Sequence, residues 1–326
     1  MSSLLDAVRR RARLIAGVFF LTAGSSGCAV MLPQTGELAN LWPAGLPERA
    51  ELADVPFFPQ EDYQCGPAAL ATSLASFGVK VGPEDLVGKV YLPARKGSLQ
   101  AEMLAAPRGY DLLSYRLAPR LGDLLREVAS GIPVVVLQDY GAWPVSLWHY
   151  AVVIGYDRGS GELMLRSGVK RRLAVPFAVF EYTWKKSDYW AMVTVPPGRI
   201  PATATESAYV EAIGAMERVG RPPAVQAAYA AFLARWPDNL KASIGLANVQ
   251  HASGRLKEAE TVLRHALERH PDSMVAINNL AQTLLDQSRG DEALSVIERA
   301  AGREGPFAAE IRETRAAILR RLGKGG

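Results

Sequence analysis

Residues 60–70 read QEDYQCGPAAL, and they are the most informative stretch of the chain. Pro67 suits the first turn of a helix, and the alanine-rich run after it predicts a helix that ends at Gly78. Cys65 therefore stands directly before a helix N-terminus, where Gly66 permits a tight turn. Unpaired N–H groups and the helix dipole favour a thiolate there, which predicts a lowered pKa and a nucleophilic role for Cys65. The alternative is a small buried apolar residue.

The residues around this helix predict a mixed α+β domain over residues 51–196. Further helical patterns cover residues 83–90, a segment capped by Ser98, and the leucine-spaced run 121–128. Strand patterns follow at 133–138, 149–156 and 162–166, with a hairpin turn at 157–161. Helices that precede antiparallel strands are typical of the α+β class.

His149 is the histidine predicted to act with Cys65. The chain has four histidines, and the other three, His251, His265 and His270, lie beyond residue 206. His149 begins a predicted strand, so it can face the end of the Cys65 helix and form a thiolate–imidazolium pair. The alternative is a histidine packed within a strand. No P-loop, dinucleotide-binding or zinc-ligand spacing appears, so we expect no cofactor and no metal.

The C-terminal part is alanine-rich and repeats itself every 34 residues. A linker is predicted at 197–206, and three helix–turn–helix units follow it, with a capping helix over 308–322. A sustained period of 34 with small residues at the helix crossings resembles tetratricopeptide repeats, so we expect an all-α repeat domain at 207–326 that binds a protein partner. The alternative is a generic stack of helical hairpins, which presents a similar concave surface.

The first 28 residues have the layout of a signal peptide. Arginines give this segment +3 of the chain's net charge of +4, and an apolar run at 14–21 follows them. The stretch AGSSGC (23–28) resembles the lipobox of bacterial lipoproteins, which implies lipidation of Cys28. The alternatives are a cleaved soluble signal and an uncleaved anchor, because Leu14–Leu32 carries no charged residue.

Residues 29–50 contain three prolines and little periodicity, so we expect a tether between the lipid and the domain. Export and lipidation place the protein on the periplasmic side of a bacterial membrane, and by the lipoprotein sorting rule Ala29 points to the outer membrane. Only +1 of net charge remains beyond residue 28, which removes the main argument for a nucleic-acid partner. Two cysteines in 326 residues also exclude a disulfide framework.

The block VPFFPQEDYQCGPAAL (55–70), followed by LWHYAVVIGYD (147–157), resembles papain-like cysteine peptidases of the bacteriocin (double-glycine) leader-peptidase type, in their stand-alone exported form. The resemblance covers roughly residues 53–185 and implies that Cys65 is the nucleophile and His149 the general base and acid. It also implies that Gln60 and the Cys65 N–H form the oxyanion hole, with Gln64 as a competitor for that role.

The third catalytic position departs from the family pattern. Relatives usually have an Asp-Pro after the strand that follows the histidine, whereas this chain has Ser167 at that position. A hydroxyl can orient an imidazole but stabilises imidazolium less than a carboxylate does. Asp157 is expected to be a turn residue. The aromatic residues Tyr140, Trp143 and Trp148, which precede the histidine, line a cleft or pack in the core.

These expectations combine into an exported, membrane-anchored cysteine peptidase that cleaves a peptide or protein substrate through an acyl-enzyme. One alternative is a peptidase-like scaffold of the cell envelope with little or no turnover. The other is a Cys-His acyltransferase or transpeptidase, because the same pair of residues also transfers acyl groups to acceptors other than water.

Overall fold

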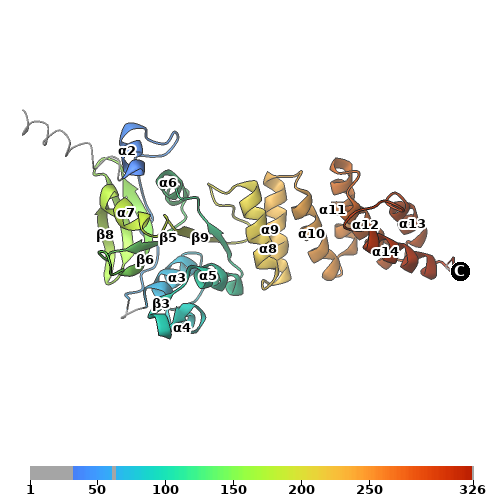
Figure 1. Cartoon of the computed structure of the whole chain (residues 1–326), viewed down its shortest axis with the longest axis horizontal. Coiled ribbons are helices and arrows are strands. Elements are labelled where there is room, and N and C mark those ends of the chain that lie inside the picture. The colour runs from blue at the N-terminus through green and yellow to red at the C-terminus, as the bar shows by residue number, and fades with distance from the viewer. Residues whose placement is uncertain (1–31, 61–63, 325–326) are drawn as a thin grey trace, which may run out of the picture. The chain divides into compact units, whose positions relative to one another are not determined.

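The structure is a computed structural model that describes residues 32–60 and 64–324 (Figure 1). The described chain forms two compact units, one made of residues 32–103 and 116–193 and the other of residues 104–115 and 194–324. An α+β unit and an all-α series of helices are present, so the predicted fold class is confirmed. The predicted signal peptide (1–28) and the lipidation site Cys28 lie outside the described residues.

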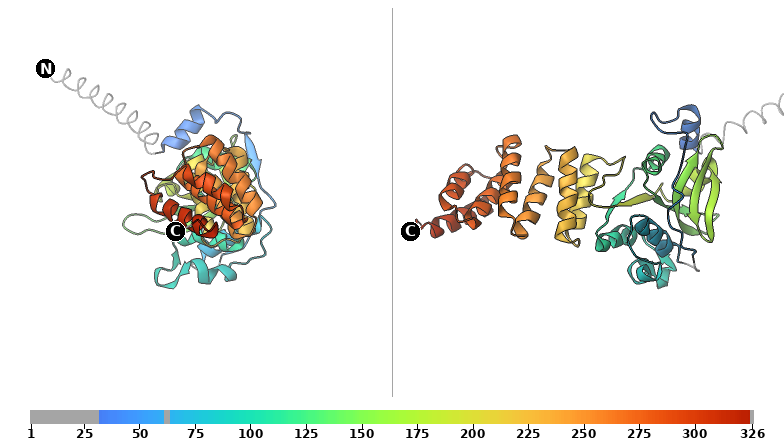
Figure 2. Two further views of the ribbon diagram at one scale, coloured as in Figure 1. Left: turned by 90° about the vertical axis from the view of Figure 1, so that its right-hand side faces the viewer. Right: turned by 180° about the vertical axis from the view of Figure 1, so that it is seen from behind.

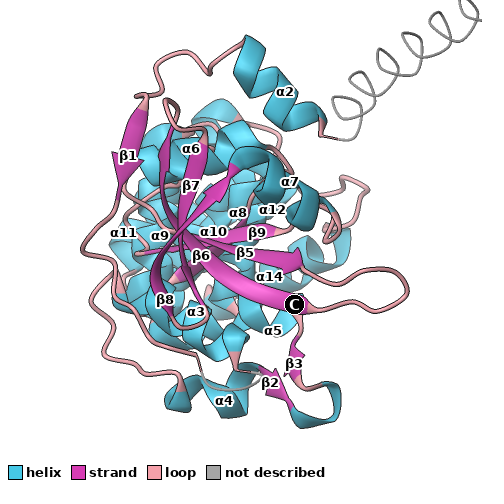
Figure 3. Ribbon diagram, turned by 90° about the vertical axis from the view of Figure 1, so that its left-hand side faces the viewer, coloured by secondary structure: helices cyan, strands magenta, loops and turns pink. Residues whose placement is uncertain are grey.

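The first unit is built on an antiparallel sheet with the strand order β9-β5-β6-β7-β8, and β1 also pairs with β6. Figure 3 shows strands β5 to β8 side by side and twisted relative to one another. The strand bounds are β1 (Arg49–Glu51), β5 (Val134–Asp139), β6 (Trp148–Asp157), β7 (Glu162–Ser167), β8 (Lys170–Pro176) and β9 (Ala191–Val195). Asp157 lies in the predicted hairpin turn, where its carboxylate accepts hydrogen bonds from the backbone N–H groups of Gly159 and Ser160.

Helices cover this sheet because its inner strands β5, β6 and β7 are largely apolar and buried. All six residues of β5 are buried, and α3 and α6 pack on β6 while α7 packs on β5. The helix bounds in this unit are α2 (Pro33–Asn40), α3 (Cys65–Ala75), α4 (Glu84–Val90), α6 (Leu121–Ala129) and α7 (Phe177–Lys185). The side chains with no exposed surface include Leu70, Leu74, Leu124, Val135, Val153, Phe180 and Trp184. Burial of such apolar surface is the main stabilising contribution.

The segment predicted to be a tether is folded, so this expectation is wrong for residues 33–50. Helix α2 begins at Pro33, and the carboxylate of Glu181 accepts hydrogen bonds from the backbone N–H groups of Gln34 at 3.0 Å and Thr35 at 2.6 Å. A carboxylate at a helix N-terminus satisfies donors that the helix itself leaves unpaired. Further along, β1 joins the sheet beside β6. Its partner strand lies about a hundred residues away in sequence, so local periodicity gave no sign of the pairing.

A small hairpin stands apart from the main sheet. Strand β2 (Tyr91–Leu92) pairs with β3 (Gly97–Ser98), and the 3₁₀ helix η1 (Pro93–Arg95) connects them. Helix α5 (Gln100–Ala105) follows. Ser98 was expected to cap this helix, but its pairing with Tyr91 places it in a strand instead.

The second unit contains helices whose starts repeat at the predicted period. Helices α8, α10 and α12 begin at residues 206, 240 and 274, and α9, α11 and α13 begin at 222, 256 and 290, so each series advances by 34. The right-hand view of Figure 2 shows them stacked one after another. The bounds are η2 (Ala106–Tyr110), β4 (Leu113–Arg116), α8 (Glu206–Glu217), α9 (Pro222–Arg235), α10 (Leu240–Ala252), α11 (Leu256–Arg269), α12 (Met274–Asp286), α13 (Gly290–Glu298) and α14 (Ala308–Arg321).

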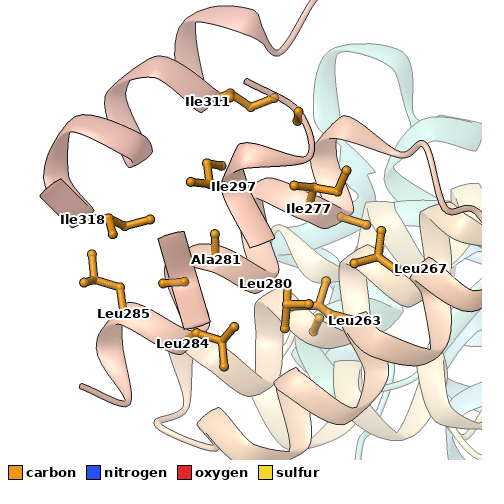
Figure 4. Packing of buried hydrophobic residues seen from close by; sticks show 14 of the residues in the cluster. Leu263, Leu267, Ile277, Leu280, Ala281, Leu284, Leu285, Ile297, Ile311 and Ile318 are labelled. Atoms are coloured by element: carbon orange, nitrogen blue, oxygen red, sulfur yellow. The ribbon is translucent and has the colours of Figure 1, made fainter. Parts of the chain in front are cut away.

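The repeat helices share a continuous apolar core. Figure 4 shows side chains from α11 to α14 gathered in one cluster, among them Leu263, Leu267, Ile277, Leu280, Leu284, Ile297, Ile311 and Ile318. Small residues let neighbouring helices approach closely. A Cβ added at Gly245 of α10 would lie 2.3 Å from the Tyr229 ring of α9, so only glycine fits at that crossing. Within residues 32–60 and 64–324, no helix has the length and apolarity needed to cross a bilayer.

Candidate active site

Cys65 is the first residue of α3, whereas the sequence predicts it directly before the helix, and its side chain is buried, with 7% of the residue exposed. The backbone N–H groups of Tyr150, Gly66 and Cys65 itself stabilise the sulfur and favour the thiolate, but burial opposes them and raises the pKa of the thiol. The expectation of a lowered pKa is therefore wrong. Burial destabilises the thiolate by removing it from water, and this effect is larger than the stabilisation that the N–H groups of the helix N-terminus provide.

His149 is the second residue of β6, where it pairs with Gln138 of β5. Its Nε2 lies 2.9 Å from the Oγ of Ser167, at the end of β7. Burial lowers the pKa of His149 from 6.5 to about 4. A lowered pKa favours the neutral imidazole, and the raised pKa of Cys65 favours the neutral thiol, so the two shifts oppose the expected thiolate–imidazolium pair.

Ser167 lies where the family resemblance places the third catalytic residue, against the histidine ring. Its hydroxyl also hydrogen-bonds the phenol of Tyr140, where it counteracts the rise in the Tyr140 pKa that burial causes. The Tyr140 hydroxyl donates to Oε1 of Gln138 at 3.0 Å. The neutral side chains of Ser167, Tyr140 and Gln138 therefore form a hydrogen-bonded series that ends at Nε2 of the imidazole, and this series contains no carboxylate.

Cys65 and His149 both line one cavity of about 820 Å³, which Gln60 also borders. Gln60 further lines a small cavity beside Cys65 and Ser167, and its backbone N–H donates to the carbonyl of Gly168 at 3.2 Å. Gln64 instead borders a different cavity, next to Pro83 and Glu84. The structure thus brings Gln60 together with the Cys-His pair and separates Gln64 from them.

Tyr140 and Trp143 lie in the loop between β5 and β6, and Trp148 is the first residue of β6. Tyr140 and Trp148 line the large cavity, and the Tyr140 ring lies 5.5 Å from the imidazole of His149. Trp143 does neither, because 96% of it is exposed at the tip of the loop. Two of the three aromatic residues therefore belong to the cleft, and none of them is a fully buried core residue.

Sequence reasoning missed the residues that hold this loop in shape. The buried carboxylate of Asp139 accepts hydrogen bonds from the N–H groups of Gly141 at 2.8 Å and Leu147 at 2.7 Å. These bonds oppose desolvation and lower the pKa of Asp139. Lys186 donates to the carbonyl of Gly141 at 2.7 Å. An aspartate at the end of a predicted strand was the only available signal, and it did not identify its partners.

The cavity offers no metal site. Across the described ranges, no three His, Cys, Asp or Glu side chains gather closely enough to hold a metal ion. The polar groups that line the cavity with the thiol are one imidazole, hydroxyls, amides and two basic side chains, which can move a proton or donate hydrogen bonds. The arrangement is suited to nucleophilic attack assisted by a general base.

The repeats carry a second, smaller cavity of about 150 Å³ between α10, α11 and α12. Amide side chains dominate it, and Nδ2 of Asn279 donates to Oδ1 of Asn248 at 2.9 Å. The lining residues are Ala247, Asn248, His251, Leu263, Asn278, Asn279, Gln282 and Thr283. Amide groups both donate and accept hydrogen bonds, as does a peptide backbone.

An α+β domain with Cys65 and His149 on one cavity, followed by helical repeats, has the architecture of a papain-like peptidase domain with tetratricopeptide repeats. Residues 52–192 match the Peptidase_C39 like family, and residues 218–276 and 252–318 match the tetratricopeptide repeat. The chain thus has a C39-like peptidase domain followed by tetratricopeptide repeats, and the predicted fusion is confirmed.

Two solved structures resemble the chain. A crystal structure described as a C39-like peptidase from Bacillus anthracis has 20% sequence identity, covers 46% of this chain and 98% of that one, and gives a TM-score of 0.39. A structure titled MamA MSR-1 C2 has 18% identity, covers 39% of this chain and 72% of that one, and gives a TM-score of 0.33. No curated protein matches the chain.

Proposed function

We propose that this protein is a cysteine peptidase in which Cys65 is the nucleophile, His149 the general base and acid, and Ser167 the residue that orients the imidazole. The observation that carries the proposal is the shared cavity. It holds a helix-terminal thiol and an imidazole whose Nε2 is already occupied by Ser167 at 2.9 Å. With Nε2 so engaged, Nδ1 is the nitrogen left to take the proton of the thiol.

Because both groups are uncharged at neutral pH, proton transfer accompanies attack. His149 takes the thiol proton while the sulfur adds to the substrate carbonyl, and Gln60 with the Cys65 N–H stabilises the oxyanion. The C–N bond then breaks, and His149 gives its proton to the leaving amine, which leaves a thioester. Water, deprotonated by His149, hydrolyses the thioester and regenerates the thiol.

The direct test is cleavage of a mixture of unrelated synthetic peptides by the full chain, read by mass spectrometry. We expect Cys65→Ala to abolish cleavage and His149→Ala to lower its rate by about 10²–10⁴-fold, the usual contribution of general acid–base catalysis. His265→Ala, which changes an exposed repeat histidine, is the matched control and should leave the rate unchanged. Undiminished cleavage by His149→Ala would refute the assignment.

A scaffold without turnover is the second candidate, because a specific observation favours it. The raised pKa of Cys65, the lowered pKa of His149 and the neutral Ser167 all oppose the ion pair that makes a thiol reactive. Under this proposal the full chain binds peptides, and wild type and Cys65→Ala yield identical, uncleaved peptides. Adding an amine-bearing peptide separates a third outcome, since an acyltransferase would join the acyl fragment of the thioester to that amine, whereas a peptidase would release it as the free acid.

The repeats support a role in protein binding, and we propose that the amide-lined cavity on α10 and α12 contributes to it. An array of synthetic peptides probed with the full chain gives a set of bound sequences. The double variant Asn248→Ala, Asn279→Ala should lose them, whereas Lys257→Ala, an exposed change on α11, should retain them. Equal binding by all three proteins would exclude this surface.

We further propose that the protein is exported and held at the periplasmic side of a membrane by a lipid on Cys28. The support is the basic, apolar and small-residue order of residues 1–28. Mass spectrometry of the membrane fraction should find an acylated Cys28 as the N-terminal residue. An unmodified N-terminus at another residue would contradict the proposal.

A further inference from the structure

The large cavity beside Cys65 has two chemically different walls. One is the β2–β3 hairpin, which contributes Arg95, Lys96, Gly97 and Ser98. The other is the β5–β6 loop with the start of β6, which contributes Tyr140, Ser146, Leu147 and Trp148. The thiol and the imidazole line the same cavity, so a peptide bound at the thiol can contact both walls.

The loop wall is apolar and exposed. Leu147 is 62% exposed, Trp148 49% and Tyr140 43%, although side chains of this kind are usually buried. The wall is also preformed, because Asp139 and Lys186 hold the loop by its backbone. A preformed apolar surface favours a large apolar side chain, since binding it removes apolar area from water without the cost of ordering a loop.

The hairpin wall is basic. Arg95 and Lys96 place two positive charges at the cavity, and among the described residues that line it there is no aspartate or glutamate. A site with one sign of charge raises the local concentration of ligands with the opposite charge. An acidic side chain is therefore the complement of this wall.

Ser98 adds a hydrogen-bonding group between the basic tip of the hairpin and the thiol. Its hydroxyl is buried and has no hydrogen-bond partner within the described part of the chain. It lies against Gly66, where an added Cβ would come within 2.2 Å of the Ser98 Oγ. A buried hydroxyl is costly when it is left without a partner, so a group from the ligand is the natural complement.

We propose that the substrate is an extended peptide with a large apolar residue and an acidic residue within the few positions around the cleaved bond. The apolar side chain lies on Leu147 and Trp148, and the acidic one pairs with Arg95 and Lys96. The Ser98 hydroxyl donates to a peptide carbonyl between them. This inference rests on the peptidase activity proposed above and names its substrate class.

The test uses the full chain and a defined peptide set in which one position is Leu or Gly and a second is Glu or Lys. We expect the Leu- and Glu-containing peptide to be cleaved about tenfold faster than its Gly counterpart and about fivefold faster than its Lys counterpart. Arg95→Glu with Lys96→Glu should reverse the charge preference and keep the apolar one. Leu147→Gln should weaken only the apolar preference, and Ser98→Ala should raise KM for every peptide.

The control for charge reversal is Lys80→Glu, an exposed change away from the cavity, which should alter neither preference. An unchanged Glu-over-Lys preference in the Arg95, Lys96 variant would overturn the proposal. Fluorescence anisotropy, used to measure binding of the same peptides to Cys65→Ala, distinguishes the proposed peptidase function from the proposed ligand class. If wild type cleaves nothing while Cys65→Ala still binds with these preferences, the peptidase function fails and the ligand class holds. If the peptides bind without preference, the ligand class fails.

Discussion

Replacing Ser167 by aspartate should convert the uncharged Cys-His pair into a more reactive one. Ser167 contacts His149 through a neutral hydroxyl at 2.9 Å, and burial holds the pKa of the imidazole at about 4. A carboxylate at the same place would favour the protonated ring. It would therefore also favour transfer of the thiol proton to His149.

The size of the effect follows from Coulomb's law. Two unit charges about 4 Å apart, at an effective dielectric constant of about 20, attract each other by about 4 kcal/mol. Desolvation of the new carboxylate opposes this attraction by roughly half of its energy, so the net stabilisation of the protonated ring is about 2 kcal/mol. At about 1.4 kcal/mol per tenfold change, the pKa of His149 should rise from about 4 to between about 5 and 6. The fraction of Cys65 present as thiolate should rise by about 30-fold.

The assay is the rate at which iodoacetamide alkylates Cys65 at fixed pH in protein with Cys28 changed to serine. The pKa of His149 is followed in parallel by nuclear magnetic resonance, with its signal identified by its loss in His149→Gln. Ser167→Asn has nearly the same shape as the aspartate but no charge, so it is the matched control and should leave the rate close to that of wild type. Equal rates for the aspartate and asparagine variants, with both proteins folded by circular dichroism, would refute the electrostatic reasoning.

Three further predictions concern stability. Gly66→Ala brings a methyl group against Ser98 and should destabilise the protein by about 1–3 kcal/mol in urea unfolding, with most of the loss recovered by adding Ser98→Gly. Glu181→Gln removes the carboxylate from the N-terminus of α2, so the amide protons of that helix should exchange with deuterium faster than in wild type, while those of α10 remain unchanged. Because the pKa of folded His149 lies below that of the unfolded chain, stability falls as the pH drops from about 6.5 to about 4, and the fall should be shallower in His149→Gln.

Much of the fold was predictable because its signals are local. A period of 34 is present in the residues themselves, and the helix after Cys65 is marked by its proline and its glycine. The strand of His149 follows from a continuous apolar run. Strand β8 was not predicted, because its alternating exposed residues KRRLAVP resemble a loop until β7 pairs with them. The pairing of β1 and the capping of α2 by Glu181 depend on contacts across more than a hundred residues.

In the candidate site, too, some features could be predicted from the sequence and others depend on the tertiary structure. The sequence predicts Cys65 from its place before a helix and His149 by elimination among the histidines, and the family resemblance predicts Ser167; the structure places Cys65 and His149 on one cavity and Ser167 beside the imidazole. The charge states of Cys65 and His149 could not be predicted from the sequence. They depend on how deeply each side chain is buried, and the sequence pattern does not reveal that burial. The basic wall was also missed, since Arg95 and Lys96 have no meaning in sequence until the hairpin brings them to the cavity.

Helix α2 changes how far the peptidase domain can travel. With Cys28 lipidated as proposed and residues 29–50 extended, the domain would reach about 75 Å from the membrane at roughly 3.5 Å per residue. Because helix α2 begins at Pro33 and Glu181 fixes its start, only residues 29–32 would separate the lipid from the domain, and four fully extended residues reach at most about 14 Å. With Cys28 lipidated, so short a tether would hold the peptidase-like domain against the bilayer surface. Substrates would then have to come to the membrane, and bonds within a few residues of a lipid headgroup would be within reach.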